Sequence, residues 1–260
     1  WTATDASGND SVTCEQTITV TDDEIPVITC PTDIVEAIPN GTTEASITII
    51  EPTATENCTG IITYTGVRDD ALLLTDPYPL GDTIITWTAT DAYGNVSASC
   101  DQTITVKSTY SLHLNVSLQG RTDYTGNYTV IIYDENDLVN PAYSLNVTAN
   151  PVGALILGTE ILPGNYKVLV KHPMYLQGLL NVSLTGNQTE TVNTLLAGDV
   201  NNDNTVTFLD YGILASTYGL NSSQTGYDSR ADFDNNLTIN FLDYAIVAGN
   251  YGLSGETQND

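Results

Sequence analysis

The sequence predicts a mostly β protein, with tandem β-sandwiches followed by a small α-helical module. β-branched residues and Tyr are abundant across its 260 residues, whereas there are only three Phe and one Met. Short runs of alternating apolar and polar residues, separated by Gly, Pro and Asn, fill the chain until about residue 207. Such residues suit pleated, half-buried surfaces, and regularly spaced short strands are typical of sandwiches. Helical patterns begin only near residue 208.

The charge balance limits the classes of partner. Six Lys and Arg face 32 Asp and Glu, which gives a formal net charge of −26. Nucleic-acid binding and adsorption to anionic lipid both need a basic face, so this acidic chain is expected to do neither. No apolar run approaches the ~20 residues of a membrane helix, so we expect no membrane insertion. Such acidity fits a secreted or extracellular surface protein, or one that is loaded with divalent cations.

An internal repeat organises the first part of the chain. Residues 1–9 return as residues 87–95, residues 16–20 return as residues 102–106, and Cys14 returns as Cys100. Alternating runs on either side of a Gly-Asn turn predict a hairpin, and the period fits one small sandwich. We therefore predict that residues 1–20 are the last hairpin of a partial module. Because an isolated hairpin is marginal in water, either an upstream segment or another copy would complete it.

Residues 21–107 are predicted to form a complete module. Pro26–Pro31, Ala54–Cys58, Pro79–Gly81 and Trp87–Asn95 with the following Cys100 occur in the order and spacing of hyalin-repeat (HYR) domains. The segment resembles that family throughout its length. The resemblance implies an immunoglobulin-like sandwich of the kind used in extracellular adhesive and structural proteins, and it implies no catalysis.

The cysteines fit an oxidising compartment. Cys30 opens the first strand of the module and Cys100 lies in the last. In an immunoglobulin-like sandwich these strands can lie side by side, so we predict a Cys30–Cys100 disulfide. Many HYR domains pair the cysteine that matches Cys58 with one in the second strand, where this chain has none. Cys58 is therefore predicted to be a free, partly buried thiol, with a Cys30–Cys58 bond as the alternative.

A second sandwich is predicted for residues 108–196. Period-two runs occur at Tyr110–Val116, Tyr128–Tyr133 and Tyr166–Lys171, and turn residues such as Leu162–Asn165 separate them. The last two segments resemble the closing strands of carboxypeptidase-regulatory-like modules. No Gly-x-Ser-x-Gly, Walker or His-Glu-x-x-His motif occurs, so we predict that this chain is not an enzyme.

Two oxygen-rich loops, at residues 199–210 and 232–243, carry the most specific chemistry. Oxygen side chains stand at loop positions 1, 3, 5, 9 and 12, and position 7 offers its carbonyl. This is the spacing of an EF-hand-like loop, which supplies the six to eight hard oxygens that Ca²⁺ prefers. The predicted ligand residues for two Ca²⁺ are Asp199, Asn201, Asp203, Thr205, Thr207 and Asp210 in the first loop, and Asp232, Asp234, Asn236, Thr238, Asn240 and Asp243 in the second.

Each loop runs into a predicted helix, 208–218 or 241–251, and a glycine follows each helix as its stop. The duplicated loop and helix resemble a type I dockerin over residues 198–252, within a module that we place at 197–260. The resemblance implies two Ca²⁺ and docking to a cohesin module. It also implies partner recognition at loop positions 10 and 11, which are Phe208, Leu209, Phe241 and Leu242. Small hydroxyl residues are common there in the family, so these pairs could instead pack inside the module or against a different surface.

Loop position 6 distinguishes the two calcium loops. This position needs a positive φ and is usually Gly. Asn204 tolerates that conformation, whereas Leu237 does not adopt it readily. The second loop is therefore predicted to be strained and to bind calcium more weakly.

Sequons and a linker add two further predictions. Asn-x-Ser/Thr occurs eleven times, about twice as often as chance predicts. One of them, Asn236, is not expected to be glycosylated because its side chain should face calcium. The predicted glycosylation sites are Asn9, Asn40, Asn57, Asn95, Asn115, Asn127, Asn146, Asn181, Asn187 and Asn221. The 21–26 linker holds three adjacent carboxylates, which predicts either a further Ca²⁺ or a solvated acidic linker.

These features together predict a non-catalytic extracellular structural or adhesive protein. It would be a surface or filament subunit that assembles end to end through its terminal modules with calcium. The expected partners are other copies of the chain or a cohesin-like module. The alternative is a dockerin-bearing accessory part of a scaffolded polysaccharide-degrading complex. Chelation is expected to unfold residues 198–252 while the sandwiches stay folded.

Overall fold

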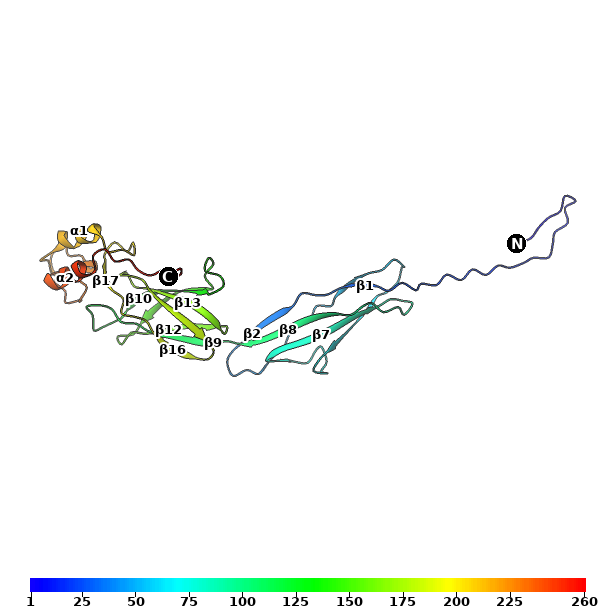
Figure 1. Ribbon diagram of the computed structural model, residues 1–260, viewed down its shortest axis with the longest axis horizontal. Helices are drawn as coiled ribbons and strands as arrows, with labels where there is room; N and C mark the ends of the chain where they lie inside the picture. Colours follow the sequence, from blue (N-terminus) through cyan, green and yellow to red (C-terminus); the bar gives the residue numbers. More distant parts are fainter. The chain divides into compact units, whose positions relative to one another are not determined.

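The computed structural model describes residues 1–260, which form seventeen strands, two α-helices and one 3₁₀ helix (Figure 1). The chain divides into two compact units. The first unit holds residues 1–36 and 43–106, and the second holds residues 37–42 and 107–260. The mostly β class with a helical C-terminal module is confirmed. The predicted boundaries at residues 20, 107 and 196 stay predictions.

The first unit is built around a four-stranded sheet in the order β2-β8-β7-β5, and two smaller sheets pair β1 with β4 and β3 with β6. The β5–β7 and β7–β8 pairs are antiparallel. The strands are β1 (Val27–Thr29), β2 (Ile34–Ile38), β3 (Glu44–Ala45), β4 (Thr53–Thr55), β5 (Thr63–Arg68), β6 (Tyr78–Pro79), β7 (Gly81–Thr90) and β8 (Cys100–Ser108).

The core of this unit lies under one face of β7 and β8. Alternate residues of these strands are buried because successive side chains of a strand point to opposite faces. Ile85 and Trp87 come from β7, and Ile104 and Val106 come from β8. The Trp87 indole donates to the buried Gln102 amide oxygen at 3.2 Å. Both halves of the predicted closing hairpin therefore supply the core.

The Cys30–Cys100 disulfide is confirmed, with 5.8 Å between the two Cα atoms. It joins the segment after β1 to the start of β8, so the alternative Cys30–Cys58 bond is wrong. Cys58 is free, as predicted, but it is exposed rather than partly buried. The reason is that the loop after β4 carries Cys58 outside the strands that build the core.

Arg68 is the only Lys or Arg of the first unit, and it is buried at the end of β5. Its guanidinium lies 3.9 Å from the centre of the Tyr78 ring and pairs with Asp70 at 2.5 Å. It also donates to the carbonyls of Leu73 and Asp76 at 3.0 and 2.9 Å. All of its donors therefore bind acceptors in the loop between β5 and β6.

Residues 1–14 form a short paired hairpin around the predicted turn, but the two full strands predicted for residues 1–20 are absent. Asp5 Oδ1 accepts bonds from the Ser7 and Asn9 amides, as Asp91 does in the repeat. The two sides are joined by one bridge, Thr4 with Asp10, and by backbone hydrogen bonds from Ser11 to Ala3 and from Cys14 to Trp1. Trp1 is 80% exposed, whereas its repeat counterpart Trp87 is 1% exposed. The pairing does not extend into regular strands because no second sheet covers it, and two-stranded hairpins need such cover.

The second unit contains the second predicted sandwich. One sheet has the order β11-β10-β13-β15 and the other has the order β12-β9-β16, in which β16 runs parallel to β9. The strands are β9 (Tyr110–Asn115), β10 (Gly126–Asp134), β11 (Tyr143–Ala149), β12 (Ala154–Ile161), β13 (Gly164–Lys171), β15 (Gly178–Leu184) and β16 (Gln188–Thr191). The likeness to carboxypeptidase-regulatory-like modules stays a prediction.

The helical module packs directly on this sandwich. A two-stranded sheet of β14 (Met174–Tyr175) and β17 (Ala197–Asp199) joins them. One continuous core runs from sandwich residues such as Leu112 to module residues such as Phe233 and Val247. The Tyr175 hydroxyl donates to the Phe233 carbonyl at 3.2 Å, and the Asn250 amide donates to the Ala197 carbonyl at 2.7 Å. The sandwich and the module therefore share one core.

Two helices close the chain, α1 (Phe208–Thr217) and α2 (Phe241–Asn250), with η1 (Ser229–Ala231) between them. Both α-helices begin with a capping box, formed by Thr207 with Asp210 and by Asn240 with Asp243. They end one residue before the predicted ends, and Gly219 and Gly252 follow at φ of 84° and 85°. At ten residues each, neither has the length and apolar character of a membrane-spanning helix.

A buried histidine gives the second unit a pH dependence. His172 is 5% exposed, and burial lowers its pKa to about 4. Arg121 and Lys171 lower this pKa further, while the bond of the ring to the Pro173 carbonyl opposes them. Below the ordinary pKa of about 6.5 the unfolded chain takes up a proton that the folded chain refuses. Above that pH this histidine does not reduce the free energy of unfolding, whereas the free energy declines as the pH falls toward 4.

We expect this group to cost about 2 kcal/mol of unfolding free energy at pH ~5 relative to neutral pH. Urea unfolding of the calcium-saturated chain at both pH values, followed by far-UV circular dichroism, measures the loss. His172→Gln is neutral throughout and should show a smaller loss by that amount, so that the comparison cancels the titration of other groups. An equal pH dependence of the two proteins would contradict the prediction.

Candidate calcium centre

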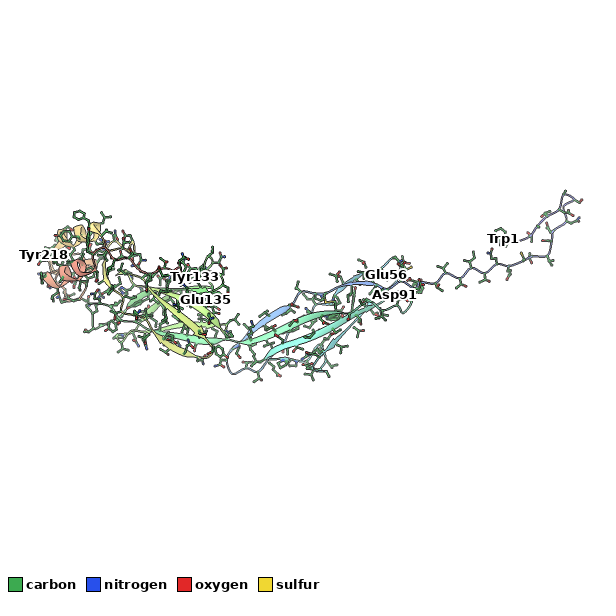
Figure 2. The ribbon with its side chains drawn as sticks, in the orientation of Figure 1. Trp1, Glu56, Asp91, Tyr133, Glu135 and Tyr218 are labelled. Carbon is green, nitrogen blue, oxygen red and sulfur yellow. A yellow bond between two sulfur atoms is a disulfide. The ribbon has the colours of Figure 1, made fainter.

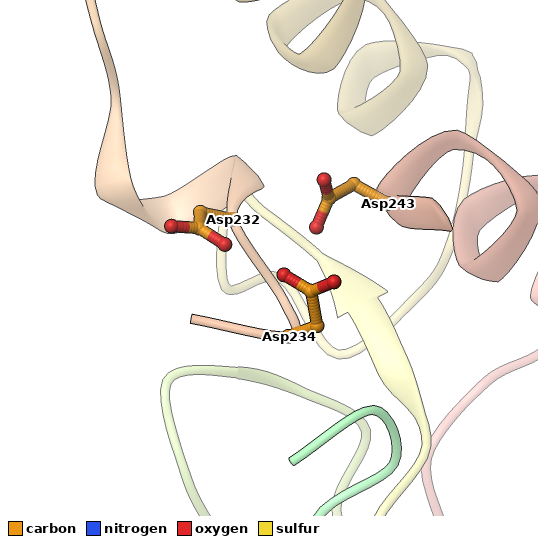
Figure 3. Close-up of side chains that lie close together, drawn as sticks. All are labelled: Asp232, Asp234 and Asp243. Carbon is orange, nitrogen blue, oxygen red and sulfur yellow. The ribbon is translucent and has the colours of Figure 1, made fainter. Parts of the chain in front are cut away.

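Three carboxylates of the second loop converge on one point. One oxygen from each of Asp232, Asp234 and Asp243 lies within 4.8 Å of the others (Figure 3). Asp232 follows η1, Asp234 lies two residues further along the loop, and Asp243 comes from the first turn of α2. Asp232 and Asp243 are almost completely buried. The fold therefore holds negative charge from three places around one small space.

Backbone amides and the Tyr227 hydroxyl hold the carboxylates of Asp232 and Asp243 in place. Asp232 Oδ2 accepts from the Leu237 amide at 2.8 Å and from the Tyr227 hydroxyl at 2.6 Å. Asp243 Oδ1 accepts from the Phe233 amide at 2.8 Å, and its Oδ2 accepts from the Asn240 amide at 2.9 Å. These bonds fix the carboxylates without neutralising them. No Lys or Arg forms an ion pair with the three.

The electrostatics of the second loop fit a cation. Burial raises the pKa of Asp234, and the nearby charges of Asp243 and Asp232 raise it further. Burial and the bond to Asp232 also raise the pKa of the Tyr227 hydroxyl, which therefore stays a donor. Like charges held this close repel one another unless a cation lies between them. The donor set of hard oxygens fits Ca²⁺.

The first loop is arranged differently. Asp199 and Asp210 are buried, but the close group of three carboxylates is found only in the second loop. Asp199 Oδ2 accepts from the Lys171 ammonium at 2.6 Å, a contact from β13 of the sandwich. Asp203 is exposed, and hydrogen bonds from Thr205 and Asn201 lower its pKa. The first loop thus has a built-in positive charge beside its position 1.

The remaining predicted ligands support the loops in two ways. Thr207 and Asn240, at position 9, are the helix N-caps that accept from the amides of Leu209 and Leu242. The side-chain amides of Asn201 and Asn236 donate to neighbouring loop carboxylates, namely Asp203 at position 5 and Asp234 at position 3. Position 7, held by Thr205 and Thr238, contributes a carbonyl in the predicted scheme. The assignment of all twelve residues to calcium stays a prediction.

Sequence reasoning missed Tyr227 and Lys171. Tyr227 lies five residues before Asp232, outside the twelve-residue pattern, and Lys171 lies 28 residues before Asp199 in a different element. No local spacing marks either of them, since the fold brings them to position 1 of each loop. The positive φ predicted for loop position 6 is confirmed, because Asn204 and Leu237 have φ of 68° and 69°. The weaker binding expected of the second loop stays a prediction.

The predicted recognition residues lie on the surface of the helical module. Phe208, Leu209, Phe241 and Leu242 are between 58% and 69% exposed, so they do not pack inside the module. Each Phe lies beside a Tyr one turn later, with ring centres 6.1 Å apart for Phe208–Tyr211 and 6.0 Å apart for Phe241–Tyr244. Tyr211 and Tyr244 meet at 6.0 Å. The two loop–helix repeats therefore present one joined aromatic surface.

A hollow of about 450 Å³ opens in this surface between the two helices. Its walls are Tyr211, Leu214, Ala215, Tyr218, Phe241 and Tyr244. Side chains of both helices contribute, and the calcium loops lie immediately before them in the chain. The loops and the apolar surface are thus parts of one structural feature. We call Phe208, Leu209, Phe241 and Leu242 the docking face.

The predicted glycosylation sites are mostly accessible. Eight of the ten asparagines are exposed, and Asn95 and Asn221 are partly buried. The Asn95 amide donates to Asp91 Oδ2 at 2.8 Å and to the Asp22 carbonyl at 3.2 Å. A glycan on this nitrogen would replace one of the two hydrogens. The modification of these residues stays a prediction.

Comparison with known families identifies two segments. Residues 21–106 match the HYR domain model, and residues 197–250 match the dockerin type I domain model. Hyalin of Strongylocentrotus purpuratus is 29% identical over 111 residues, which are 40% of this chain and 8% of that protein. The chain therefore spans only a small part of its curated relative. HYR and dockerin domains are non-catalytic modules, and dockerin type I domains bind calcium.

Two solved structures are similar to parts of the chain. A C-terminal interface mutant of a type II cohesin–X–dockerin complex from Acetivibrio cellulolyticus is 18% identical, with a TM-score of 0.47 over 56% of this chain and 97% of that one. The Bacillus anthracis TIE protein is 12% identical, with a TM-score of 0.28 over 68% of this chain and 41% of that one.

Proposed function

We propose that the chain is an extracellular adhesive or assembly protein that attaches to a cohesin-type module through its docking face in the presence of calcium. The observation that carries this proposal is the exposure of four large apolar side chains directly after the two calcium loops. Contiguous exposed apolar surface marks interaction sites, and aromatic anchors dominate binding energy. The HYR domain supports an extracellular adhesive or structural role for the rest of the chain.

Calcium and docking are coupled through the start of each helix. The position-12 carboxylates, Asp210 and Asp243, immediately follow the pairs of the docking face and also form the capping boxes. A cation held by these carboxylates fixes the first helical turn and with it the direction of the adjacent Phe and Leu. Without the cation, carboxylate repulsion loosens the same turn. Calcium would therefore act on the docking face without touching the partner.

Binding to a purified cohesin module, measured by calorimetry with and without calcium, tests this function. The Phe208→Asp, Leu209→Asp, Phe241→Asp and Leu242→Asp changes together should weaken binding at least a hundredfold, since each buried anchor is worth about 2 kcal/mol or more. Changing only one pair should have a smaller effect because the repeat keeps the other. The matched control is Val139→Asp, since Val139 is 84% exposed and lies in the sandwich. Unchanged binding by the fourfold variant would exclude the docking face.

A second candidate is end-to-end association of copies through residues 1–20. Trp1, Ile18 and Val20 are at least 77% exposed, while Trp87, Ile104 and Val106 at the same repeat positions are buried. Apolar residues of a half-formed sandwich are expected to seek a second sheet. Light scattering of the chain alone in the calorimetry buffer is the control, and a strictly monomeric chain would remove this candidate.

A further inference from the structure

Position 1 of the two calcium loops is held by the same arrangement of donors. Asp199 in the first loop and Asp232 in the second are both buried. In each of them Oδ2 accepts from the position-6 backbone amide, at 2.9 Å in the first loop and 2.8 Å in the second. The same oxygen accepts from one side chain outside the loop, which is Lys171 in the first and Tyr227 in the second, each at 2.6 Å. The two outer donors are equivalent in place, but only Lys171 carries a charge.

This charge comes from the sandwich and not from the helical module. Lys171 is the last residue of β13; in Figure 2, Tyr133 marks the neighbouring strand β10 and Tyr218 marks the end of α1. The Lys171 side chain is 15% exposed and that of Asp199 is 0% exposed. Salt and water screen a largely buried pair much less than a surface pair. The positive charge therefore acts strongly on the first loop.

Further contacts keep the first loop and Lys171 together. The Gln177 amide of the sandwich donates to Asn204 Oδ1 at position 6, at 2.8 Å. The Gly255 amide, from the segment after α2, donates to the Asn204 carbonyl at 2.9 Å. The ammonium of Lys171 also donates to the Tyr175 carbonyl. The ion pair is therefore fixed at both ends by the surrounding structure.

The charge of Lys171 also reaches position 5 of the first loop. Hydrogen bonds from Thr205 and Asn201 lower the pKa of Asp203 there, and the charge of Lys171 lowers it further. The first loop has three carboxylates among its predicted ligands, as the second loop has. The two loops therefore differ in the charge that the sandwich supplies and not in the number of their own charges.

The second loop receives no comparable charge. Burial raises the pKa of Asp234, and the charges of Asp243 and Asp232 raise it further. Arg121 approaches this loop from the sandwich, but its guanidinium donates to the backbone carbonyls of Phe233 and Asp232, at 3.1 and 3.5 Å, and not to a carboxylate. Relief of the repulsion in the second loop is therefore left to a cation from solution.

We propose that Lys171 is an internal counter-ion of the first calcium loop, through which the sandwich lowers the affinity of that loop for Ca²⁺. An ammonium has no lone pair, so Lys171 cannot itself be a ligand. It acts through Asp199, whose charge it partly neutralises, and its own charge opposes a cation bound in the same loop. This effect is separate from the backbone strain at Leu237, which concerns the second loop. The proposal rests on calcium binding by the dockerin module and not on docking to a cohesin.

The rate of calcium release from the loaded full chain tests this proposal. Stopped-flow mixing with a fluorescent calcium chelator resolves release from the two loops and starts from the folded, loaded state. Lys171→Met removes the opposing charge and should slow one of the two phases roughly tenfold, leaving the other unchanged. A purely structural or ligand-orienting role predicts the opposite sign, because damage to the loop speeds release. Unchanged or faster release from Lys171→Met would overturn the proposal.

Three variants control for charge, place and shape. Lys167→Met removes the same charge from the same strand, where Lys167 contacts only the Asp260 carbonyl, and should leave both phases unchanged. Tyr227→Phe removes the neutral donor of the second loop and should slow neither phase. Lys171→Arg keeps the charge and should release calcium as the unmodified chain does, so slow release from it would also contradict the proposal. If Lys171→Met does not fold, Lys171→Gln replaces it with the same expected result.

The outcome separates this proposal from the proposed function. Release rates are measured without a cohesin, so an unaltered rate in Lys171→Met leaves calcium-dependent docking standing. A chain from which the chelator draws no calcium at all would overturn both.

Discussion

Chelation of calcium is expected to unfold the helical module and to destabilise the sandwich beneath it. At free calcium a thousandfold above its dissociation constant, each site contributes about 4 kcal/mol, which EGTA removes. The helices contribute little stability by themselves, because α1 and α2 are ten residues long and isolated helices of that length are marginal in water. The sandwich should follow in part, since Tyr175 and Phe233 belong to one continuous core. This revises the expectation that the sandwiches stay unaffected.

Far-UV circular dichroism of the helices and scanning calorimetry measure this effect. The transition of the second unit should move to lower temperature as a whole, instead of splitting into a module step and an unchanged sandwich step. Leu237→Asn is the informative variant, because Asn matches Asn204 of the first loop and relieves a positive φ that costs Leu roughly 1–2 kcal/mol. Tighter binding in this variant would support strain in the second loop. A second-unit transition that is identical with and without EGTA would show that calcium does not stabilise this unit.

Removal of the Cys30–Cys100 disulfide is expected to lower the unfolding free energy of the first unit by about 4 kcal/mol. The bond closes a loop of 70 residues, and in the chain-entropy view that constraint acts mainly on the unfolded state. The core adds little stability to compensate for the lost bond, since it depends on a few side chains of β7 and β8 around Trp87. The Cys30→Ser, Cys100→Ser double variant should therefore be partly unfolded at physiological temperature.

Urea unfolding followed by tryptophan fluorescence measures this loss in the full chain with calcium present. Cys14→Ser is the matched control, because Cys14 is the repeat counterpart of Cys100 but is free and exposed. It should change stability by no more than about 0.5 kcal/mol. A double variant as stable as the control would mean that strand pairing alone holds β1 and β8 in place.

Local patterns were predictable from the sequence, and contacts between distant segments were not. The positive φ of Asn204 and Leu237 followed from loop spacing, and the Cys30–Cys100 pair followed from the family resemblance. The Lys171–Asp199 contact did not, because no pattern links β13 to a loop that begins 28 residues later. The strands expected in residues 1–20 failed for a related reason, since strand formation depends on a covering sheet.

The same limit applies to the docking face. The dockerin resemblance singled out Phe208 and Leu209 at loop positions 10 and 11 but left open whether they point inward, because the first turn of a helix can face either way. Their exposure is a property of how α1 lies on the shared core. The packing of Asp22 against the loop at Glu56 and the turn at Asp91 is a further example, since these segments are 34 and 69 residues away in the sequence. Only tertiary structure places them together.

The position of the disulfide determines how the chain would carry a mechanical load. Tension applied along the polypeptide reaches Cys30 four residues after Pro26 and can cross the sulfur–sulfur bond directly into Cys100 at the start of β8. From there it continues through β8 into β9 of the second unit. The 70-residue separation between the cysteines is bypassed, so about 240 Å of extended chain stays locked even when the sheet hydrogen bonds fail. A fibre or surface tether built from such units would resist stretching through covalent bonds and would yield first elsewhere along the molecule.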